Sequence, residues 1–285
     1  MEFLVIDRDK TTKIERPLGL NIDSIYNMDC LEGMRQMEDE SVDLTVTSPP
    51  YDNLRTYNGY CFDFENIARE LYRVTKHGGV VVWIVGDATI EGDETGASFR
   101  QALYFKECGF KLHDTMIYSK SSVPCYDPDC RRYKQCFEYM FVLSKGKPKT
   151  FNPILDRPIL KDVVMHDAPH GRNRDGVRRD YQRVYESKDF QTRFNIWEYS
   201  IGFNCTTKDE IAYKHPAVFP ELLARDHIKS WSNEGDIVLD PFMGSGTTAK
   251  VARALGRHYI GFEISAEYCD IIRQRLEQTK SLFDL

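Results

Sequence analysis

An apolar strand that ends at two consecutive prolines constrains the fold of this chain more than any other feature. The strand is predicted to be Val42–Thr47. Pro49 and Pro50 have no N–H to donate and a fixed φ, so Ser48 is held extended and the strand must stop. The oxygens of this turn stay free to accept hydrogen bonds, and Tyr51 adds a flat ring beside them. The turn therefore suits a planar heteroaromatic group with an exocyclic amine, which describes a nucleobase.

A second apolar strand, Ile237–Asp240, leads into a glycine-containing turn and then into helix-forming sequence. Gly244 and Gly246 allow a tight turn, and the start of the helix offers free N–H groups and a positive partial charge. We expect a carboxylate or phosphate to bind there. The next strand, His258–Phe262, ends at Glu263, where a βαβ nucleotide site places an acid that bridges ribose hydroxyls.

Strands alternate with helices of about ten residues along the remaining chain, which predicts a doubly wound, mostly parallel α/β sheet. The run Gly79–Val85 is apolar and β-branched, as expected for a central strand. Because parallel sheets bind ligands at the carboxyl ends of their strands, the turns after Thr47 and Asp240 are expected to lie side by side. Helices are expected at 30–37, 64–74, 99–107, 220–231, 247–255 and 266–278, and further strands at 111–118 and 138–143.

Both turns resemble motifs of the amino-group DNA methyltransferases that use S-adenosyl-L-methionine. Thr47–Tyr51 is similar to their motif IV, and Asp240–Thr247 is similar to motif I. The catalytic motif comes first, as in the circularly permuted β-class enzymes, which carry a target-recognition region between the two motifs. Three further segments, Asn27–Cys30, Gly78–Trp83 and Lys214–Pro220, resemble additional motifs in the same order.

The resemblance implies a Rossmann-like class I methyltransferase fold in three parts. These are a catalytic half at 1–151, an inserted target-recognition region at 152–205 and a cofactor-binding half at 206–285. It also implies a catalytic turn and a cofactor site. The catalytic residues are Ser48, Pro49, Pro50 and Tyr51, and the cofactor residues are Asp29, His215, Phe219, Asp240, Pro241, Phe242, Gly244, Ser245, Gly246, Thr247 and Glu263.

The chemistry implied is direct methyl transfer to the exocyclic amine of a base flipped out of duplex DNA. Acceptors at Ser48 and Pro49 would stabilise the positive charge that grows on the amine nitrogen. In this family a serine at the first catalytic position is associated with cytosine N4 and an aspartate with adenine N6. Ser48 therefore favours N4-methylcytosine, and N6-methyladenine stays the alternative.

The charge of the chain is unevenly distributed, which bears on DNA binding. The net charge is −6, yet residues 120–193 carry 16 Lys and Arg against 10 Asp and Glu. Within them, Gly171–Arg183 mixes arginines with Asn, Gln and Tyr, the composition of a segment that contacts phosphates and base edges. A solvated surface loop would have the same composition. The arginines expected at DNA are Arg131, Arg132, Arg172, Arg174, Arg178, Arg179 and Arg183.

Other classes of protein fit parts of the sequence less well. Gly244, Gly246 and Ala249 with a downstream Glu263 also match a dinucleotide fingerprint, but the Ser48 turn has no role in an NAD-dependent oxidoreductase. A non-catalytic DNA-binding or S-adenosyl-L-methionine-sensing module should have a broken catalytic turn, whereas this turn is intact. Enzymes that methylate RNA or protein generally place the cofactor motif first. No metal is expected, because the spacing of Cys125, Cys130 and Cys136 misses the usual zinc pairs.

Double-stranded DNA is the expected partner, and the resemblance leaves open a homodimer and a restriction endonuclease of the same system. The sequence has neither the pattern of a signal peptide nor a run approaching the ~20 apolar residues of a membrane span. We therefore expect a cytoplasmic, DNA-associated protein of a prokaryote or its phage.

Overall fold

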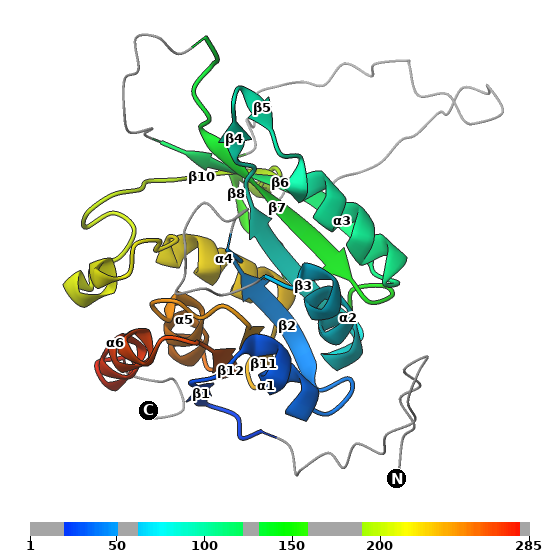
Figure 1. Ribbon diagram of the computed structural model, residues 1–285, viewed down its shortest axis with the longest axis vertical. Helices are drawn as coiled ribbons and strands as arrows, with labels where there is room; N and C mark the ends of the chain where they lie inside the picture. Colours follow the sequence, from blue (N-terminus) through cyan, green and yellow to red (C-terminus); the bar gives the residue numbers. More distant parts are fainter. Residues whose placement is uncertain (1–19, 51–61, 122–130, 159–189, 280–285) are drawn as a thin grey trace, which may run out of the picture. The chain divides into compact units, whose positions relative to one another are not determined.

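The computed structural model describes residues 20–50, 62–121, 131–158 and 190–279, which form two compact units (Figure 1). The larger unit comprises the described residues up to Asn152 and from Asn195 onward. The smaller unit is Pro153–Phe194. None of the helices in these described ranges is long and apolar enough to cross a membrane.

The larger unit is built on an eight-stranded sheet in which β7 alone runs antiparallel to its neighbours, within the part of the chain that the structure describes. The expected mostly parallel α/β fold is therefore confirmed. The strands in sheet order are β1 (Ser24–Tyr26), β12 (His258–Phe262), β11 (Ile237–Asp240), β2 (Val42–Thr47), β3 (Thr75–Val85), β7 (Phe137–Ser144), β6 (Lys111–Lys120) and β10 (Ile196–Tyr199).

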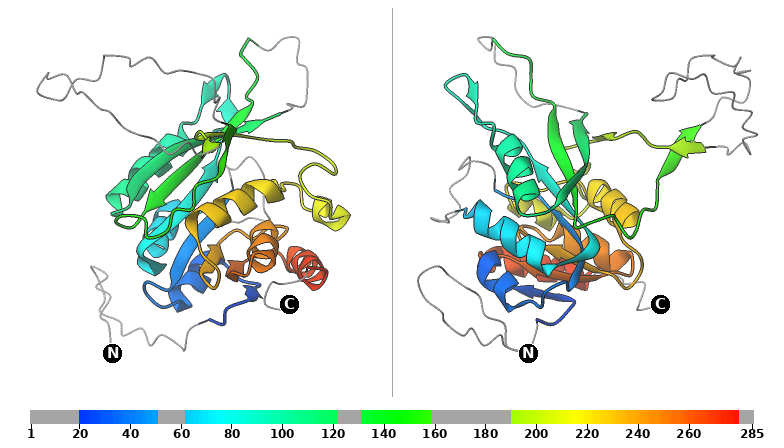
Figure 2. Two further views of the ribbon diagram at one scale, coloured as in Figure 1. Left: turned by 180° about the vertical axis from the view of Figure 1, so that it is seen from behind. Right: turned by 90° about the vertical axis from the view of Figure 1, so that its right-hand side faces the viewer.

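Helices cover both faces of this sheet (Figures 1 and 2). One row consists of α1, α2 and α3, and the other consists of α4, α5 and α6. Their bounds are α1 (Cys30–Gln36), α2 (Phe64–Val74), α3 (Ala97–Glu107), α4 (Glu221–Trp231), α5 (Thr247–Ala254) and α6 (Ala266–Glu277), with a 3₁₀ helix η1 at Glu210–Lys214.

The apolar run in β3 is buried on both sides of the sheet, as its sequence predicts. Val81, Trp83 and Val85 belong to the hydrophobic core formed with α1, α2 and α3. Val82 and Ile84 are also fully buried, and alternation along the strand directs them to the opposite face. Burial on both faces is what a central strand of a doubly wound sheet requires.

Strands β11 and β2 lie side by side although almost two hundred residues separate them. Val238 pairs with Leu44 and Leu239 pairs with Thr45 in parallel register. The Thr47 hydroxyl donates a 2.7 Å hydrogen bond to Asp240 Oδ1 at the ends of the two strands. The turn after β2 and the turn after β11 consequently start from neighbouring points on one sheet edge, as expected from the sequence.

Each unit also contains a short antiparallel pair, which in the larger unit is formed by β4 (Thr89–Ile90) and β5 (Asp93–Glu94). In the smaller unit, β8 (Leu155–Pro158) pairs with β9 (Phe190–Thr192), and the Arg157 guanidinium lies 3.3 Å from the centre of the Phe194 ring. The expected insertion at 152–205 is wider than this unit. Residues from Asn195 onward belong to the larger unit and supply β10, an edge strand of its sheet.

Candidate active site

A cavity of about 530 Å³ opens at the carboxyl ends of the parallel strands in the larger unit. Ser48, Pro49 and Pro50, which follow β2, form one part of its wall. Another part comes from the turn Pro241–Ser245 and from Thr247, which follow β11. The two turns singled out in the sequence therefore line one cavity. Tyr51, the fourth expected catalytic residue, lies outside the described residues.

Asp240 connects the two turns from behind the cavity wall and does not line it. Its carboxylate is 1% exposed, and Oδ1 accepts hydrogen bonds from the Thr47 hydroxyl (2.7 Å) and the Phe242 N–H (3.1 Å). Oδ2 has no hydrogen-bond partner among the described residues, and the Thr248 hydroxyl donates to the Val46 carbonyl. Burial raises the pKa of Asp240 to about 6, against the opposing effect of its hydrogen bonds.

The glycine turn keeps its shape through two residues with positive φ. Gly244 has a φ of +52° and Gly246 a φ of +81°, a region that favours glycine. The Gly246 N–H closes the turn on the Met243 carbonyl at 2.7 Å. A Cβ at Gly246 would lie 2.6 Å from the Ile272 side chain of α6. Gly246 thus lets the start of α5 approach α6 closely and is absent from the cavity wall.

Glu263 follows β12 and presents an oriented carboxylate to the cavity. The Gly244 N–H donates to Oε2 and the Ser265 N–H donates to Oε1, each at 2.9 Å. Burial raises the pKa of Glu263, and these backbone hydrogen bonds oppose the rise. A carboxylate oxygen can accept more than one hydrogen bond, so each oxygen can still accept from a hydroxyl of a ligand.

A third wall of the cavity is His215–Phe219, which precedes α4. Both N and O of Ala217 lie within 3.1 Å of His215 Nδ1, and the Tyr268 ring of α6 packs edge-on against the imidazole at 4.5 Å. These contacts fix the bend that turns Phe219 toward the cavity. Phe242 lines the opposite turn and also packs against the aromatic core, with its ring centroid 6.2 Å from that of Trp83.

Comparisons with known proteins identify the family of this chain. Residues 42–274 match the model of the N6/N4 methyltransferase family, described as DNA methylase. The chain is a member of this family. It is 61% identical over 240 residues to the orphan methyltransferase M.BamHII of Bacillus amyloliquefaciens, a match that covers 84% of this chain and 90% of the relative. It is 26% identical to M.SmaI of Serratia marcescens over 87% of this chain and 88% of that one.

Solved structures of methyltransferases have the same fold. The cytosine-N4-specific PvuII DNA methyltransferase superposes with a TM-score of 0.61 at 20% identity, over 94% of this chain and 97% of that one. The complex of M1.HpyAVI with S-adenosyl-L-methionine gives 0.56 at 23% identity, over 88% and 98%. The family membership removes the oxidoreductase interpretation of the glycine turn.

S-adenosyl-L-methionine is the cofactor of this DNA methyltransferase, and the residues of the cavity fit it. The Glu263 carboxylate can accept from ribose hydroxyls, and the Phe242 and Phe219 side chains give the wall apolar surface. Ser245 and Thr247 lie at the start of α5, where N–H groups suit a carboxylate. Of the expected cofactor residues, the wall contains His215, Phe219, Pro241, Phe242, Gly244, Ser245, Thr247 and Glu263.

Asp29, Asp240 and Gly246 were expected to contact the cofactor but are not in the wall. Asp29 caps α1 instead, since its Oδ1 accepts from the N–H groups of Leu31 and Glu32 at 2.8 and 3.2 Å. An aspartate that satisfies the first N–H groups of a helix has a structural use for its carboxylate. Asp240 and Gly246 do not line the cavity, but their contacts stabilise the turns that form its wall.

The structure describes two of the arginines expected to contact DNA, Arg131 and Arg132. Arg132 donates to the Glu94 carboxylate at 2.6 Å and to the Gly92 carbonyl at 3.1 Å, so its guanidinium is engaged by the β4–β5 hairpin (Thr89–Ile90 with Asp93–Glu94). Arg131 is exposed. The other five lie outside the described residues: Arg172, Arg174, Arg178, Arg179 and Arg183.

The sequence analysis missed further polar residues of the wall, among them Tyr118 and Lys120 at the end of β6 and Glu138 at the start of β7. Lys120 Nζ lies 2.6 Å from Glu138 Oε1. Burial raises the pKa of Tyr118, and the neighbouring Glu138 charge adds to the rise. A rule that ligands bind at the carboxyl ends of parallel strands would have found the β6 residues.

Asp87, which follows β3, does not line the cavity either. Its Oδ1 accepts from the Ser98 N–H at 2.9 Å at the start of α3. Among the described residues no three His, Cys, Asp or Glu side chains gather as a metal site. Cys125 and Cys130 fall outside the described residues, while Cys136 is exposed.

Proposed function

We propose that this enzyme methylates the N4 amine of a cytosine that is flipped out of duplex DNA. The observation that carries the proposal is the shared cavity, in which the Ser48–Pro50 turn and the Pro241–Thr247 turn face one space. A cofactor held by the second turn and a base held by the first would meet there. Flipping costs a few kcal/mol, which stacking on an aromatic side chain would partly offset.

The chemistry depends on making an aromatic amine nucleophilic, because its lone pair is delocalised into the ring. When bound, S-adenosyl-L-methionine supplies an electrophilic methyl group on a sulfonium. Hydrogen bonds from the amine to the Ser48 hydroxyl and the Pro49 carbonyl favour a pyramidal nitrogen and stabilise its growing positive charge. Attack by the amine nitrogen would form the new N–C bond as the S–C bond of the cofactor breaks, and the proton that the nitrogen loses would pass to solvent.

The choice of cytosine rests on the side chains that face the base. Ser48 takes the position that is associated with cytosine N4, and the PvuII enzyme of the same fold is cytosine-N4-specific. Lys120 offers an ammonium donor to the cavity. Cytosine has a carbonyl, O2, that can accept from such a donor, whereas the corresponding edge position of adenine is a C–H. Lys120→Met should then weaken transfer to cytosine more than it weakens cofactor binding.

Nucleoside mass spectrometry of duplex DNA treated with the purified enzyme and S-adenosyl-L-methionine tests the base. We expect N4-methylcytosine, and a Ser48→Ala enzyme serves as the control for contaminating activity. N6-methyladenine as the product would overturn the cytosine assignment while leaving the amine site in place. No methylated base of either kind on DNA of varied sequence would overturn the proposal.

We further propose that 152–205 is the target-recognition region and that Gly171–Arg183 reads the DNA sequence. M.BamHII is named an orphan methyltransferase, which favours an enzyme that acts without a dedicated endonuclease. The homodimer stays a prediction that sedimentation analysis with and without DNA would test.

A further inference from the structure

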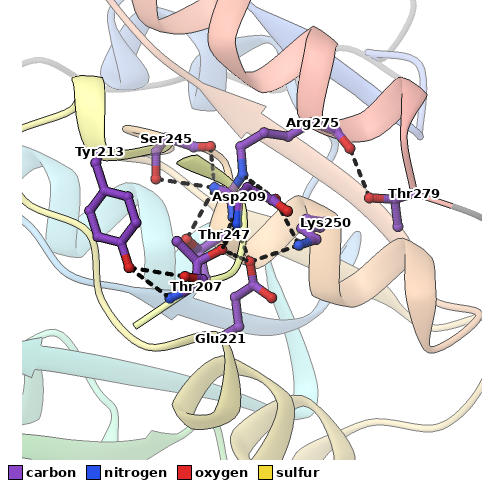
Figure 3. Close-up of polar contacts among 9 residues, drawn as sticks. All are labelled: Thr207, Asp209, Tyr213, Glu221, Ser245, Thr247, Lys250, Arg275 and Thr279. Carbon is purple, nitrogen blue, oxygen red and sulfur yellow. Dashed lines mark hydrogen bonds and ion pairs between the residues drawn. The ribbon is translucent and has the colours of Figure 1, made fainter. Parts of the chain in front are cut away.

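A fully buried arginine joins two walls of the cofactor cavity from behind. Arg275 lies on α6, and its side chain is 0% exposed. Its guanidinium is surrounded by residues from the glycine turn, from the segment before α4, and from α5 (Figure 3). Arg275 does not line the cavity, so the cofactor contacts alone do not explain it.

On one side Arg275 holds the glycine turn. Nη1 donates to the Ser245 carbonyl at 2.6 Å and lies 3.2 Å from the Ser245 hydroxyl and 3.4 Å from the Thr247 hydroxyl. The strongest of these bonds goes to a backbone carbonyl and fixes the peptide that follows Ser245. Ser245 and Thr247 are both in the cavity wall, so Arg275 determines how this wall is presented.

On its other side Arg275 binds two carboxylates that flank the His215–Phe219 wall in the chain. Nε donates to Asp209 Oδ2 at 2.9 Å, and Nη2 donates to Glu221 Oε1 at 2.7 Å. Asp209 precedes this wall in the chain and Glu221 follows it. Lys250 of α5 binds the same two carboxylates, at 2.7 and 2.8 Å (Figure 3).

The charges of this cluster balance. Two carboxylates face two cations, and the pKa of Asp209 is lowered: burial opposes this, but the hydrogen bonds and charges of Lys250 and Arg275 outweigh it. A guanidinium is planar and forms several directed hydrogen bonds at once, which a lysine ammonium cannot reproduce. Among the described residues, Lys250 Nζ binds the two carboxylates, whereas the Arg275 guanidinium binds these carboxylates and the glycine turn.

We propose that Arg275 is a positioning residue that sets the spacing between the glycine turn and the His215–Phe219 wall, and thereby the affinity for S-adenosyl-L-methionine. The inference rests on this cavity being the cofactor site. It is independent of which base receives the methyl group.

The test compares Arg275→Lys with a matched control. Arg257 is also a buried arginine that binds backbone carbonyls, those of Leu255 (2.6 Å) and Ser232 (2.8 Å), but it touches neither wall. Calorimetric titration of each full-length variant with S-adenosyl-L-methionine gives the Kd, and thermal unfolding gives the Tm. We expect Arg275→Lys to raise the Kd about tenfold or more, because the loss of the charge-assisted hydrogen bond to the Ser245 carbonyl lets the glycine turn shift away from the geometry that binds the cofactor. Arg257→Lys should lower the Tm and leave the Kd within about twofold.

Further measurements keep the outcomes distinct. At saturating cofactor, the kcat of Arg275→Lys should stay within a few-fold of wild type, because Arg275 touches neither reacting group. Should Arg275→Lys fail to fold, Asp209→Asn neutralises one of the two carboxylates that Arg275 binds and should also raise the Kd. An unchanged Kd in a folded Arg275→Lys would overturn the inference, whereas wild-type protein that fails to bind S-adenosyl-L-methionine would overturn the assignment of the cavity.

Discussion

At the scale of single residues, Ser48 carries the most specific chemical prediction. In the mechanism we propose, its hydroxyl accepts from an amine whose positive charge appears only as the N–C bond forms, so its effect would belong to the transition state. Ser48→Ala should reduce single-turnover methyl transfer on the order of 10²-fold or more, with much smaller changes in DNA and cofactor affinity. Transfer at the wild-type rate would contradict the amine site, and Ser24→Ala, on β1, controls for the substitution itself.

Glu263 should matter for cofactor binding and little for the fold. Glu263→Ala removes the carboxylate that Gly244 and Ser265 orient, and with it charge-assisted hydrogen bonds worth about 1.5 to 3 kcal/mol. The Kd for S-adenosyl-L-methionine should rise roughly tenfold or more in a calorimetric titration. An unchanged Kd with an intact fold would show that ribose recognition lies elsewhere.

Asp240 makes the stability of the protein depend on pH in an unusual direction. Its pKa is about 6 in the folded protein and 3.8 as the reference value. Between these values the folded state binds the extra proton, so this residue's contribution to stability falls as pH rises from about 4 to 6 and is constant above. The total loss is up to about 3 kcal/mol.

Asp240→Asn keeps an oxygen for the Thr47 hydroxyl and the Phe242 N–H but cannot titrate. Urea unfolding at pH 4.5 and pH 7 should show that the variant loses less stability, or gains more, than wild type over this rise in pH. Asp270→Asn, which removes an exposed carboxylate on α6, is the control. A difference between wild type and Asp240→Asn that does not change with pH would refute the assignment.

At the scale of elements, local sequence predicted most helices and strands because their ends carry local signals. Asp29, Asp63 and Ser265 cap α1, α2 and α6 with side-chain oxygens, and each of these helices begins where the sequence analysis placed it. Strand β3 begins four residues before the expected Gly79. The first part of β3, which starts at Thr75, has a polar sequence that gives no local sign of a strand. In the structure this part pairs with β2 across an irregularity in register.

Strand β10 could not be predicted from its own residues. Ile196–Tyr199 sits in a stretch rich in turn residues, and its strand conformation comes from pairing with β6, for example Ile196 with Ile117. The cluster around Arg275 was missed for the same physical reason, since its partners Asp209 and Glu221 lie 66 and 54 residues away. Contacts between distant residues leave no periodic pattern in the sequence. The two motif turns, by contrast, were found from local composition alone.

The junction between the glycine turn and α6 offers a prediction with a close control. Gly246 and Gly235 share a φ of +81°, but a Cβ would meet Ile272 at 2.6 Å at Gly246 and nothing within 4 Å at Gly235. Both Gly→Ala variants should lose about 1 kcal/mol to backbone strain. Gly246→Ala should lose a further 1 to 3 kcal/mol to overpacking, and should also weaken cofactor binding. Equal losses in the free energy of unfolding of the two variants, measured with urea, would mean that α6 shifts to accommodate the added Cβ without cost.

At the scale of the whole molecule, chemistry and target recognition are assigned to different parts of the chain. All cavity-lining residues belong to the larger unit, while the basic segment proposed to read DNA falls within Pro153–Phe194. Such a division predicts that substitutions in the basic segment change DNA binding without changing cofactor binding. Family resemblance suggested the division, because motif order along the chain leaves the recognition region between the two halves.

The decisive substitution is the pair Arg178→Ala and Arg179→Ala. If both side chains contact phosphates, their loss should weaken DNA binding and reduce the slope of log K against log salt by about 2, since each contact releases close to one counterion. Fluorescence anisotropy with a labelled duplex from 50 to 300 mM salt measures both quantities, and calorimetry should show unchanged S-adenosyl-L-methionine affinity. Arg273→Ala, an exposed arginine on α6, should leave the slope unaltered. If the double variant keeps the wild-type affinity and slope, Gly171–Arg183 is a solvated segment and recognition must be sought elsewhere in the chain.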